Sequence, residues 1–240
     1  MQDVTLIKTK AELRRLTYWD IRERELTKEE ITHLLVLCDA LWLHSGNPKD
    51  PHVELNSGRY SNGFVDVLRA LRYTRLCELL AHQMVRQIEK KLREFERDIV
   101  VEWVVGSDHA GAAFSHSVAT WMGAQHDFTE KGFVGEQDWR RFVIKPDEVI
   151  LQVEELMTTA RTLLVVREGI RIGNPHTVTF APLVAVLVHR SHVYEIDETP
   201  VVYLVHYDIA VWDPENCPLC AEGSERLRPK QQWLKLTGKE

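Results

Sequence analysis

The fold class is decided by one stretch of the sequence, Val149-Ile150-Leu151-Gln152-Val153-Glu154-Glu155-Leu156-Met157-Thr158-Thr159-Ala160-Arg161-Thr162. An apolar run followed by two acids and a hydroxyl-rich turn is typical of a buried strand that leads into a helix. Backbone N–H groups and the helix dipole favour an anion at such a turn, and threonine hydroxyls add donors. The carboxylates beside it can accept hydrogen bonds from sugar hydroxyls. The stretch therefore predicts a site for a phosphorylated ribose; the alternative is an ordinary strand–turn–helix with threonine caps and surface acids.

The rest of the second half of the chain has a similar pattern of short β-rich runs, separated by loops and helix-length segments. A helix-like segment, Ala112 to Met122, lies between the first two of these runs. The runs are Ile99 to Val105, Val149 to Val153, Pro182 to Val188 and Pro200 to Val205. They predict an α/β fold with an open, mainly parallel sheet flanked by helices, whose ligand binds outside the carboxyl ends of the strands.

The first half of the chain predicts helices and a loop. Thr27 and Glu30 form a capping box, and the apolar spacing that follows predicts a helix from Thr27 to His44. A second, longer helix is expected from Thr74 to about Glu96, and the polar stretch from Asn56 to Gly63 is expected to be a loop. We divide the chain into an N-terminal helical extension (residues 1–50), a main domain (51–213) and a C-terminal tail (214–240).

Composition limits the function classes. The chain has 240 residues, of which 44% are hydrophobic, so one main domain is expected. Thirty basic and thirty-six acidic side chains give a formal charge of −6 without a basic stripe, which argues against a nucleic-acid partner. The longest apolar run, Ala181 to Val188, is too short to cross a membrane, and residues 1–10 have no signal-peptide core. We expect a cytoplasmic protein with no membrane partner.

The four cysteines do not form a disulfide framework. Cys38 and Cys77 lie in helix-like segments, and Cys217 and Cys220 form a single C-x-x-C pair. A metal there would need His206, another distant histidine or a second subunit, because structural zinc usually takes four ligands. The alternative is a pair of reduced thiols in a turn, and the sequence alone therefore assigns no metal ligand.

Two loops carry further candidate residues. Val104 to Gly111 reads as a strand that ends in a glycine-containing loop, where the backbone can approach an anion closely. Its candidate contacts are Ser107, Asp108, His109, Ala110 and Gly111. The glycine- and charge-rich stretch from Glu130 to Arg141 is a candidate mobile loop, and it contains Lys131; the alternative is a charged surface hairpin.

Together these segments resemble the type I phosphoribosyltransferases. The stretch from Val149 resembles their signature for the diphosphoribosyl donor: a strand, two acids, two spacers and Thr-Thr-Gly-Gly-Ser/Thr. Val104 to Gly111 resembles the family's pyrophosphate loop. Phe128 to Gly132 and Arg140 to Glu148 resemble its flexible catalytic loop and the return strand before the signature.

Other segments are most similar to the orotate phosphoribosyltransferases. Leu55 to Ser61 resembles their Ser-Gly-Arg/Lys loop at the base site, and Val186 to Arg190 resembles a strand end whose arginine meets the substrate carboxylate. The C-terminal segment from Cys217 to Gly223 resembles a tail of some bacterial members. The pieces are collinear from about His52 to Pro229.

The resemblance implies a magnesium-dependent enzyme that transfers phosphoribose from phosphoribosyl diphosphate to a nitrogenous base, with orotate and pyrimidine nucleotide synthesis favoured. It implies that Lys131, Glu154 and Glu155 take part in catalysis. It further implies that the Ser107 to Gly111 loop and the turn formed by Thr158, Thr159, Ala160, Arg161 and Thr162 hold the donor, and that Ser57, Gly58, Arg59 and Arg190 bind the base. We expect small-molecule substrates and a homodimer.

The chain also departs from the family pattern. Ala160 and Arg161 replace two glycines, so either the backbone of the turn avoids positive φ or the pocket is altered. His189 replaces an acid beside Arg190. Two alternatives follow: a non-catalytic nucleotide-binding or regulatory protein with the same fold, and an enzyme that uses a different base.

Overall fold

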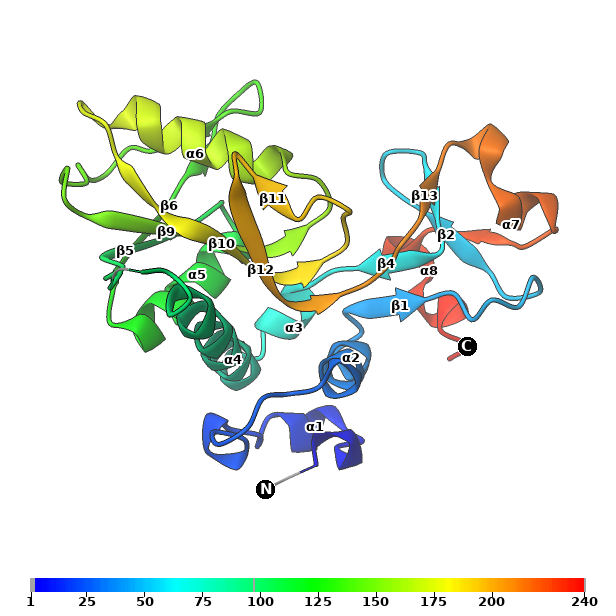
Figure 1. Ribbon diagram of the computed structural model, residues 1–240. Helices are drawn as coiled ribbons and strands as arrows, with labels where there is room; N and C mark the ends of the chain where they lie inside the picture. Colours follow the sequence, from blue (N-terminus) through cyan, green and yellow to red (C-terminus); the bar gives the residue numbers. More distant parts are fainter. Residues whose placement is uncertain (1–2, 97, 240) are drawn as a thin grey trace.

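The computed structural model describes residues 3–96 and 98–239, and a six-stranded sheet lies at the centre of its larger lobe (Figure 1). The strand order is β11-β12-β10-β9-β5-β6, and every neighbouring pair is parallel except β11 with β12. The strands are β5 (Trp103–Gly106), β6 (Gln125–Phe128), β9 (Val149–Met157), β10 (Thr179–His189), β11 (Glu195–Ile196) and β12 (Thr199–His206). The predicted open, mainly parallel sheet is confirmed.

Helices cover both faces of this sheet (Figure 1). The helices α4 (Thr74–Leu92) and α5 (Ala110–Met122) pack on one face, and α6 (Arg161–Gly173) lies on the other. Successive residues of β5 point to opposite faces: Val104 belongs to the large core under α4 and α5, while Val105 packs with Val166 of α6. The central strands β5, β9 and β10 are mostly buried and largely apolar, and this is the reason the sequence identified them. The polar edge strand β6 was not predicted.

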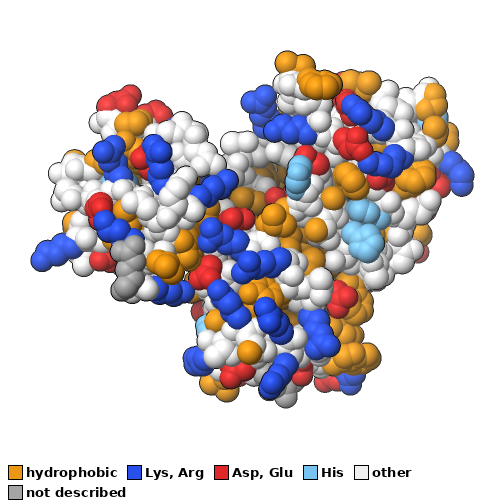
Figure 2. Space-filling model, turned by 180° about the vertical axis from the view of Figure 1, so that it is seen from behind, with side chains coloured by type: hydrophobic (Ala, Val, Ile, Leu, Met, Phe, Trp, Pro, Cys, Tyr) orange, Lys and Arg blue, Asp and Glu red, His pale blue; other side chains and the backbone are white. Residues whose placement is uncertain are grey.

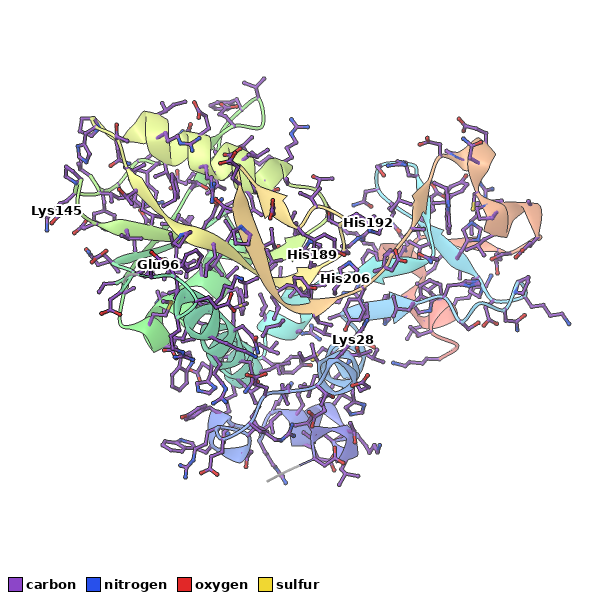
Figure 3. The ribbon with its side chains drawn as sticks, in the orientation of Figure 1. Lys28, Glu96, Lys145, His189, His192 and His206 are labelled. Carbon is purple, nitrogen blue, oxygen red and sulfur yellow. The ribbon has the colours of Figure 1, made fainter. Side chains whose placement is uncertain are left out.

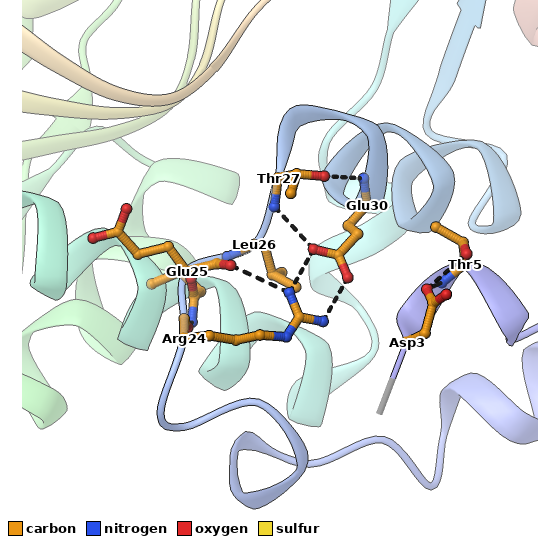
Figure 4. A network of polar contacts seen from close by, with 8 residues as sticks. Asp3, Thr5, Arg24, Glu25, Leu26, Thr27 and Glu30 are labelled. Atoms are coloured by element: carbon orange, nitrogen blue, oxygen red, sulfur yellow. Dashed lines mark hydrogen bonds and ion pairs between the residues drawn. The ribbon is translucent and has the colours of Figure 1, made fainter. Parts of the chain in front are cut away.

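The N-terminal segment packs against the large core through short helices. These are η1 (Val4–Leu6), α1 (Lys10–Leu13), η2 (Tyr18–Asp20) and α2 (Lys28–Leu37). The predicted capping box is present: the Thr27 hydroxyl accepts from the backbone N–H of Glu30, and the Glu30 carboxylate accepts from that of Thr27. Arg24 also donates to the Glu30 carboxylate (Figure 4). This network fixes the start of α2.

Three predicted boundaries were wrong. The helix that begins after Thr27 ends at Leu37 and not at His44, because β1 (Leu41–Leu43) pairs with β4 (Gly63–Val65). Likewise, α4 ends at Leu92 and not near Glu96. The stretch expected to be a loop, residues 56–63, contains β3 (Tyr60–Ser61) and the first residue of β4. These strands have only two or three residues each, so local pattern did not reveal them.

A small lobe is built from both halves of the chain (Figure 1). Its four-stranded sheet has the order β13-β3-β2-β14, and β2 (His52–Glu54) pairs in parallel with β14 (Arg226–Leu227). Its other elements are β13 (Val211–Trp212), η3 (Pro214–Asn216), α7 (Pro218–Ala221) and α8 (Pro229–Leu236), while α3 (Leu68–Leu71) connects β4 to α4. Seen from behind, the outline of the molecule has a notch between the two lobes (Figure 2).

The stretch from Glu130 to Arg141 begins as a hairpin rather than an irregular loop. Its strands are β7 (Glu130–Lys131) and β8 (Gln137–Asp138), and the turn between them exposes Phe133 and Val134. The return strand is therefore β8, and the expectation of a strand within residues 140–148 was wrong. In the described part of the chain, no helix is long and apolar enough to span a bilayer.

Candidate active site

The centre of the candidate site is a contact between the ends of two neighbouring strands. Ser107, which follows β5, donates from its backbone N to Glu154 Oε1 at 2.9 Å and from its hydroxyl to Glu154 Oε2 at 2.7 Å. Glu154 is 2% exposed. Burial, followed by the nearby charge of Glu155, holds the pKa of Glu154 well above its usual range, while the Ser107 bonds oppose that shift. Both carboxylate oxygens of Glu154 are thus committed to the loop.

Glu155 is the acid that has an oxygen free. Its Oε2 is buried and has no hydrogen-bond partner among the described residues. Burial raises the pKa of this carboxyl group, and the charge of Asp108 raises it further. A buried acceptor without a partner destabilises the folded protein. A ligand that donates a hydrogen bond to this oxygen, or a metal ion that it coordinates, would remove that cost and bind more tightly as a result.

Gly111 lets the loop from Ser107 to Gly111 approach these acids closely. A Cβ at this position would lie 2.5 Å from Ser107 Oγ and 2.8 Å from Glu154 Oε2. The loop is also conformationally unusual, because His109 has φ +59° and ψ −107° at the start of α5. Its ring Nδ1 lies 2.8 Å from Asp108 Oδ2, and its side chain is otherwise exposed. Such backbone positions are uncommon outside glycine and are found at ligand-binding loops.

The turn after β9 accommodates the two substitutions of the signature. Ala160 has φ −70° and ψ −8°, which any residue adopts, and none of residues 158–162 has positive φ. The turn therefore does not need glycine. Leu164 N donates to Ala160 O, so the N–H groups before it lie at the open end of α6. Thr158 and Thr159 are exposed at this end.

One cavity of about 500 Å³ joins these elements. It is lined by residues of the loop after β5, the β7–β8 hairpin, the end of β9 and the start of α6: Ser107, Asp108, His109, Ala110, Lys131, Gly135, Gln137, Glu154, Glu155, Leu156, Arg161, Thr162 and Val165. Two exposed cations line this cavity: Arg161, at the start of α6, and Lys131, on the β7–β8 hairpin. The cavity thus combines cations, acids and a helix N-terminus.

The remaining predicted residues lie around this cavity or away from it. Gly111, Thr158, Thr159 and Ala160 adjoin lining residues. Ser57, Gly58 and Arg59 belong to the small lobe, in the loop between β2 and β3, and they do not line the cavity. Arg59 Nε lies 2.9 Å from Asp213 Oδ1, which ties it to the small lobe.

Arg190 follows β10 and is half-buried. Its Nε has no hydrogen-bond partner among the described residues, and burial lowers its pKa. His189 beside it is fully buried, and its ring contacts those of Tyr194 and Tyr203, with centroids 5.1 Å from each. Figure 3 shows His189, His192 and His206 near one another on the side of the sheet that faces the small lobe. This end of β10 therefore offers aromatic rings beside a partly buried cation.

Sequence reasoning missed several residues of this region. Gln137 lines the cavity, and its Oε1 accepts from the Thr129 hydroxyl at 2.8 Å, which joins β8 to the end of β6. Tyr194 and Tyr203 were not singled out either. No local signal marks these residues, because the hairpin pairing and the fold of β11 onto β12 bring them into place.

The parallel sheet, the two carboxylates near the end of β9 and the adjacent strand-end loop resemble those of the type I phosphoribosyltransferases. No family model matches the chain. Two solved structures share its fold: UMP synthase from Leishmania donovani (TM-score 0.52, 16% identity, 89% of this chain and 42% of that one) and orotate phosphoribosyltransferase from Aeropyrum pernix (TM-score 0.50, 16% identity, 73% and 93%).

Sequence comparison is more specific. The chain is 29% identical to the orotate phosphoribosyltransferase of Heliobacterium modesticaldum over 180 residues, which covers 74% of this chain and 88% of that protein. It is 27% identical to that of Thermotoga maritima over 191 residues, with 80% and 96% covered. The chain is thus most like the orotate phosphoribosyltransferases, as its motifs indicated.

Proposed function

We propose that this protein is a phosphoribosyltransferase that transfers 5-phosphoribose from phosphoribosyl diphosphate to orotate, a step of pyrimidine nucleotide synthesis. The observation that carries the proposal is the buried, unpartnered Oε2 of Glu155, beside a cavity that also contains an anion-binding loop and the N-terminus of α6. The similarity to proteins named orotate phosphoribosyltransferase supports the same reaction.

The donor's ribose and 5′-phosphate occupy adjacent parts of this cavity. The turn from Thr158 to Thr162 binds the phosphate through N–H groups and hydroxyls, with Arg161 as a nearby cation. Glu155 accepts hydrogen bonds from the ribose hydroxyls. Glu154 holds the Ser107 loop in place through its two hydrogen bonds and so fixes the distance between the ribose and pyrophosphate subsites.

The leaving pyrophosphate lies over the loop from Ser107 to Gly111. Negative charge accumulates on the pyrophosphate as its bond to the anomeric carbon breaks, and positive charge develops on the ribose. Lys131 stabilises the first charge when the hairpin covers the cavity, and the carboxylates of Glu154 and Glu155 stabilise the second. The protein supplies positioning and electrostatics, and no covalent intermediate with it is required.

The residues present fit a magnesium ion. Asp108 and Glu155 place carboxylates at the same cavity, one of them with a free oxygen, and Mg²⁺ prefers such hard oxygen ligands together with substrate phosphates. When bound, the ion neutralises pyrophosphate charge and helps orient the leaving group.

The base site is proposed between the end of β10 and the small lobe. The buried Nε of Arg190 has no hydrogen-bond partner in the described part of the chain, and a substrate carboxylate would accept a hydrogen bond from it. Ser57, Gly58 and Arg59 would approach from the small lobe. A carboxylated base such as orotate fits this charge better than a neutral base. A homodimer is part of the proposal, and so is a cytoplasmic location, which was expected from the sequence before any resemblance was considered.

The test is a pyrophosphate-release assay of the full chain with phosphoribosyl diphosphate, Mg²⁺ and a panel of bases: orotate, uracil, adenine, hypoxanthine and guanine. Pyrophosphate release is expected with orotate. Arg190→Gln should weaken the binding of orotate without changing the affinity for phosphoribosyl diphosphate. Release with another base alone would reassign the substrate. Donor binding by calorimetry without release from any base would instead favour the non-catalytic alternative.

A further inference from the structure

A second cluster of chemically active side chains lies in the small lobe, away from the proposed active site. His52 at the start of β2 meets Cys217 and Cys220 of the C-terminal C-x-x-C pair. His52 Nε2 is 3.6 Å from Cys217 Sγ and 3.3 Å from Cys220 Sγ. The partner of the cysteine pair is thus His52 and not His206, although it lies more than 160 positions earlier in the sequence.

The ring of His52 is oriented by hydrogen bonds that define its tautomer. Ser224 Oγ donates its only proton to the carbonyl oxygen of Asp50 at 2.6 Å, and it lies 2.9 Å from His52 Nδ1. The hydroxyl must therefore accept from Nδ1–H. In neutral imidazole, Nε2 then carries the lone pair, and it faces the two sulfur atoms. This is the arrangement of a metal-binding histidine held by a second partner.

The spacing of the three ligand atoms is that of a tetrahedral zinc site. With Zn–S about 2.3 Å and Zn–N about 2.05 Å, a tetrahedron has N···S edges of about 3.5 Å and an S···S edge of about 3.8 Å. The two N···S distances, 3.6 and 3.3 Å, lie close to the first value, and all three atoms lie within 4.8 Å of one another. Little rearrangement is needed to place an ion among them.

The small lobe also has a structural need for such an ion. Among the residues that the structure describes, its own hydrophobic cluster has three buried members, Val53, Leu227 and Leu236, with a few half-buried side chains around them. A core of this size contributes little stability, and small units of this kind commonly depend on a metal or another cross-link. The three ligands connect β2 directly with the tail that supplies β14 and α8.

We propose that His52 Nε2, Cys217 Sγ and Cys220 Sγ bind one Zn²⁺ ion, which fixes the C-terminal tail to β2. No fourth histidine, cysteine or carboxylate joins the cluster among residues 3–96 and 98–239. Water therefore takes the fourth position, on the side of the half-buried Cys220, while His52 and Cys217 are buried. Binding deprotonates the two thiols and releases their protons to solvent. The inference does not depend on the proposed transferase activity.

The experiment uses the full chain, purified with a reductant and freed of metal with a chelator. Titration with Co²⁺ should give a thiolate-to-cobalt charge-transfer band and intense visible bands of a four-coordinate ion, saturating at one ion per chain. Zn²⁺ should displace the cobalt and raise the melting temperature of the metal-free protein. Absence of the charge-transfer band would overturn the proposal.

Variants separate this site from other thiols. Cys220→Ser should weaken Zn²⁺ binding at least tenfold and reduce the charge-transfer band, whereas Cys77→Ser, a thiol in α4, should leave both unchanged. Ser224→Ala keeps all three ligands and removes the partner of Nδ1, so it should weaken binding by about tenfold while the cobalt spectrum is retained.

Equal loss of the cobalt signal in Cys77→Ser and Cys220→Ser would contradict the assignment. So would a Cys217–Cys220 disulfide, found by mass spectrometry of alkylated peptides, that persists with excess Zn²⁺ and reductant. Far-UV circular dichroism confirms that each variant is folded before its metal binding is compared.

Discussion

Ser107 holds both carboxylate oxygens of Glu154, through its backbone N–H at 2.9 Å and its hydroxyl at 2.7 Å. This pair connects the loop after β5 to the end of β9, the two segments that we propose bind the donor. We expect Ser107→Ala to destabilise the fold by about 1 to 3 kcal/mol, because one buried carboxylate oxygen loses its donor. Chemical denaturation measures this. Thr120→Ala, which removes an exposed hydroxyl of α5, is the control. An equal effect of the two changes would contradict the role of the Ser107–Glu154 contact.

The buried charge of Glu155, which we propose the donor site requires, should reduce the stability of the fold. Its pKa is raised above the ordinary 4.5 by burial, so the folded state binds its proton more tightly than the unfolded state does. The contribution of this group to stability is therefore greatest below about pH 4.5 and falls as the pH rises through the folded-state pKa. Glu155→Gln removes the buried charge, and at pH 8 we expect it to raise the free energy of unfolding by about 0.5 to 2 kcal/mol.

That gain should disappear at about pH 4, where the carboxyl group is protonated in both states. Calorimetry of the same variant should show donor binding weakened at least tenfold. Glu168→Gln, an exposed acid of α6, should change neither quantity. If Glu155→Gln changes the free energy of unfolding by the same amount at pH 8 as at pH 4, the buried charge of Glu155 does not reduce the stability of the folded state.

Thr159 should contribute a hydroxyl to the 5′-phosphate. We expect Thr159→Val to weaken binding of phosphoribosyl diphosphate by about 1 to 3 kcal/mol, the usual loss for a hydrogen bond to a charged group. Thr177→Val, in the exposed loop before β10 at the opposite edge of the sheet, is the matched control. The affinity of each variant for phosphoribosyl diphosphate is measured by calorimetry with Mg²⁺ present. An unchanged affinity of Thr159→Val would mean that Thr159 has a purely structural role.

Arg161 should act as a phosphate-binding cation. It is exposed on the cavity wall at the first position of α6, where a glycine stands in the family signature. We expect Arg161→Gly to lower donor affinity by about 1.5 to 3 kcal/mol, because a charged donor to the phosphate is lost. Arg161→Ala, which preserves helix propensity, should lose as much. Tighter binding by either variant would show that the arginine obstructs the site.

The β7–β8 hairpin should behave as a lid. Its turn, from Gly132 to Glu136, exposes Phe133 and Val134, and limited proteolysis there should slow when donor and Mg²⁺ are added.

Lys131→Ala should lower kcat by roughly tenfold to a hundredfold with less effect on donor affinity, because the charge that it meets grows during bond breaking. Lys145→Ala, far from the small lobe in Figure 3, is the control. Equal cleavage with and without ligand would count against closure.

The sequence by itself determined the sheet and the order of the motifs. Strands buried on both faces are continuously apolar, and a threonine turn after two acids is a local signal, so β5, β9, β10 and β12 and the donor motifs were recognisable. The same local character identified α5 and the capping box of α2. Short strands such as β1 and β3 were missed because a run of two or three residues carries little local pattern, and β3 also depends on β13 near the other end of the chain.

Only the tertiary structure shows the conformation of the substituted signature and which residue lies beside the cysteine pair. Ala160 takes a helical conformation that a sequence motif cannot reveal, since φ depends on how β9 and α6 are packed. Likewise, the division of work between Glu154, held by Ser107, and Glu155, with a free oxygen, follows from which loop lies beside β9. His52 reaches Cys217 and Cys220 because β2 pairs with β14, and this long-range pairing has no local sequence signal.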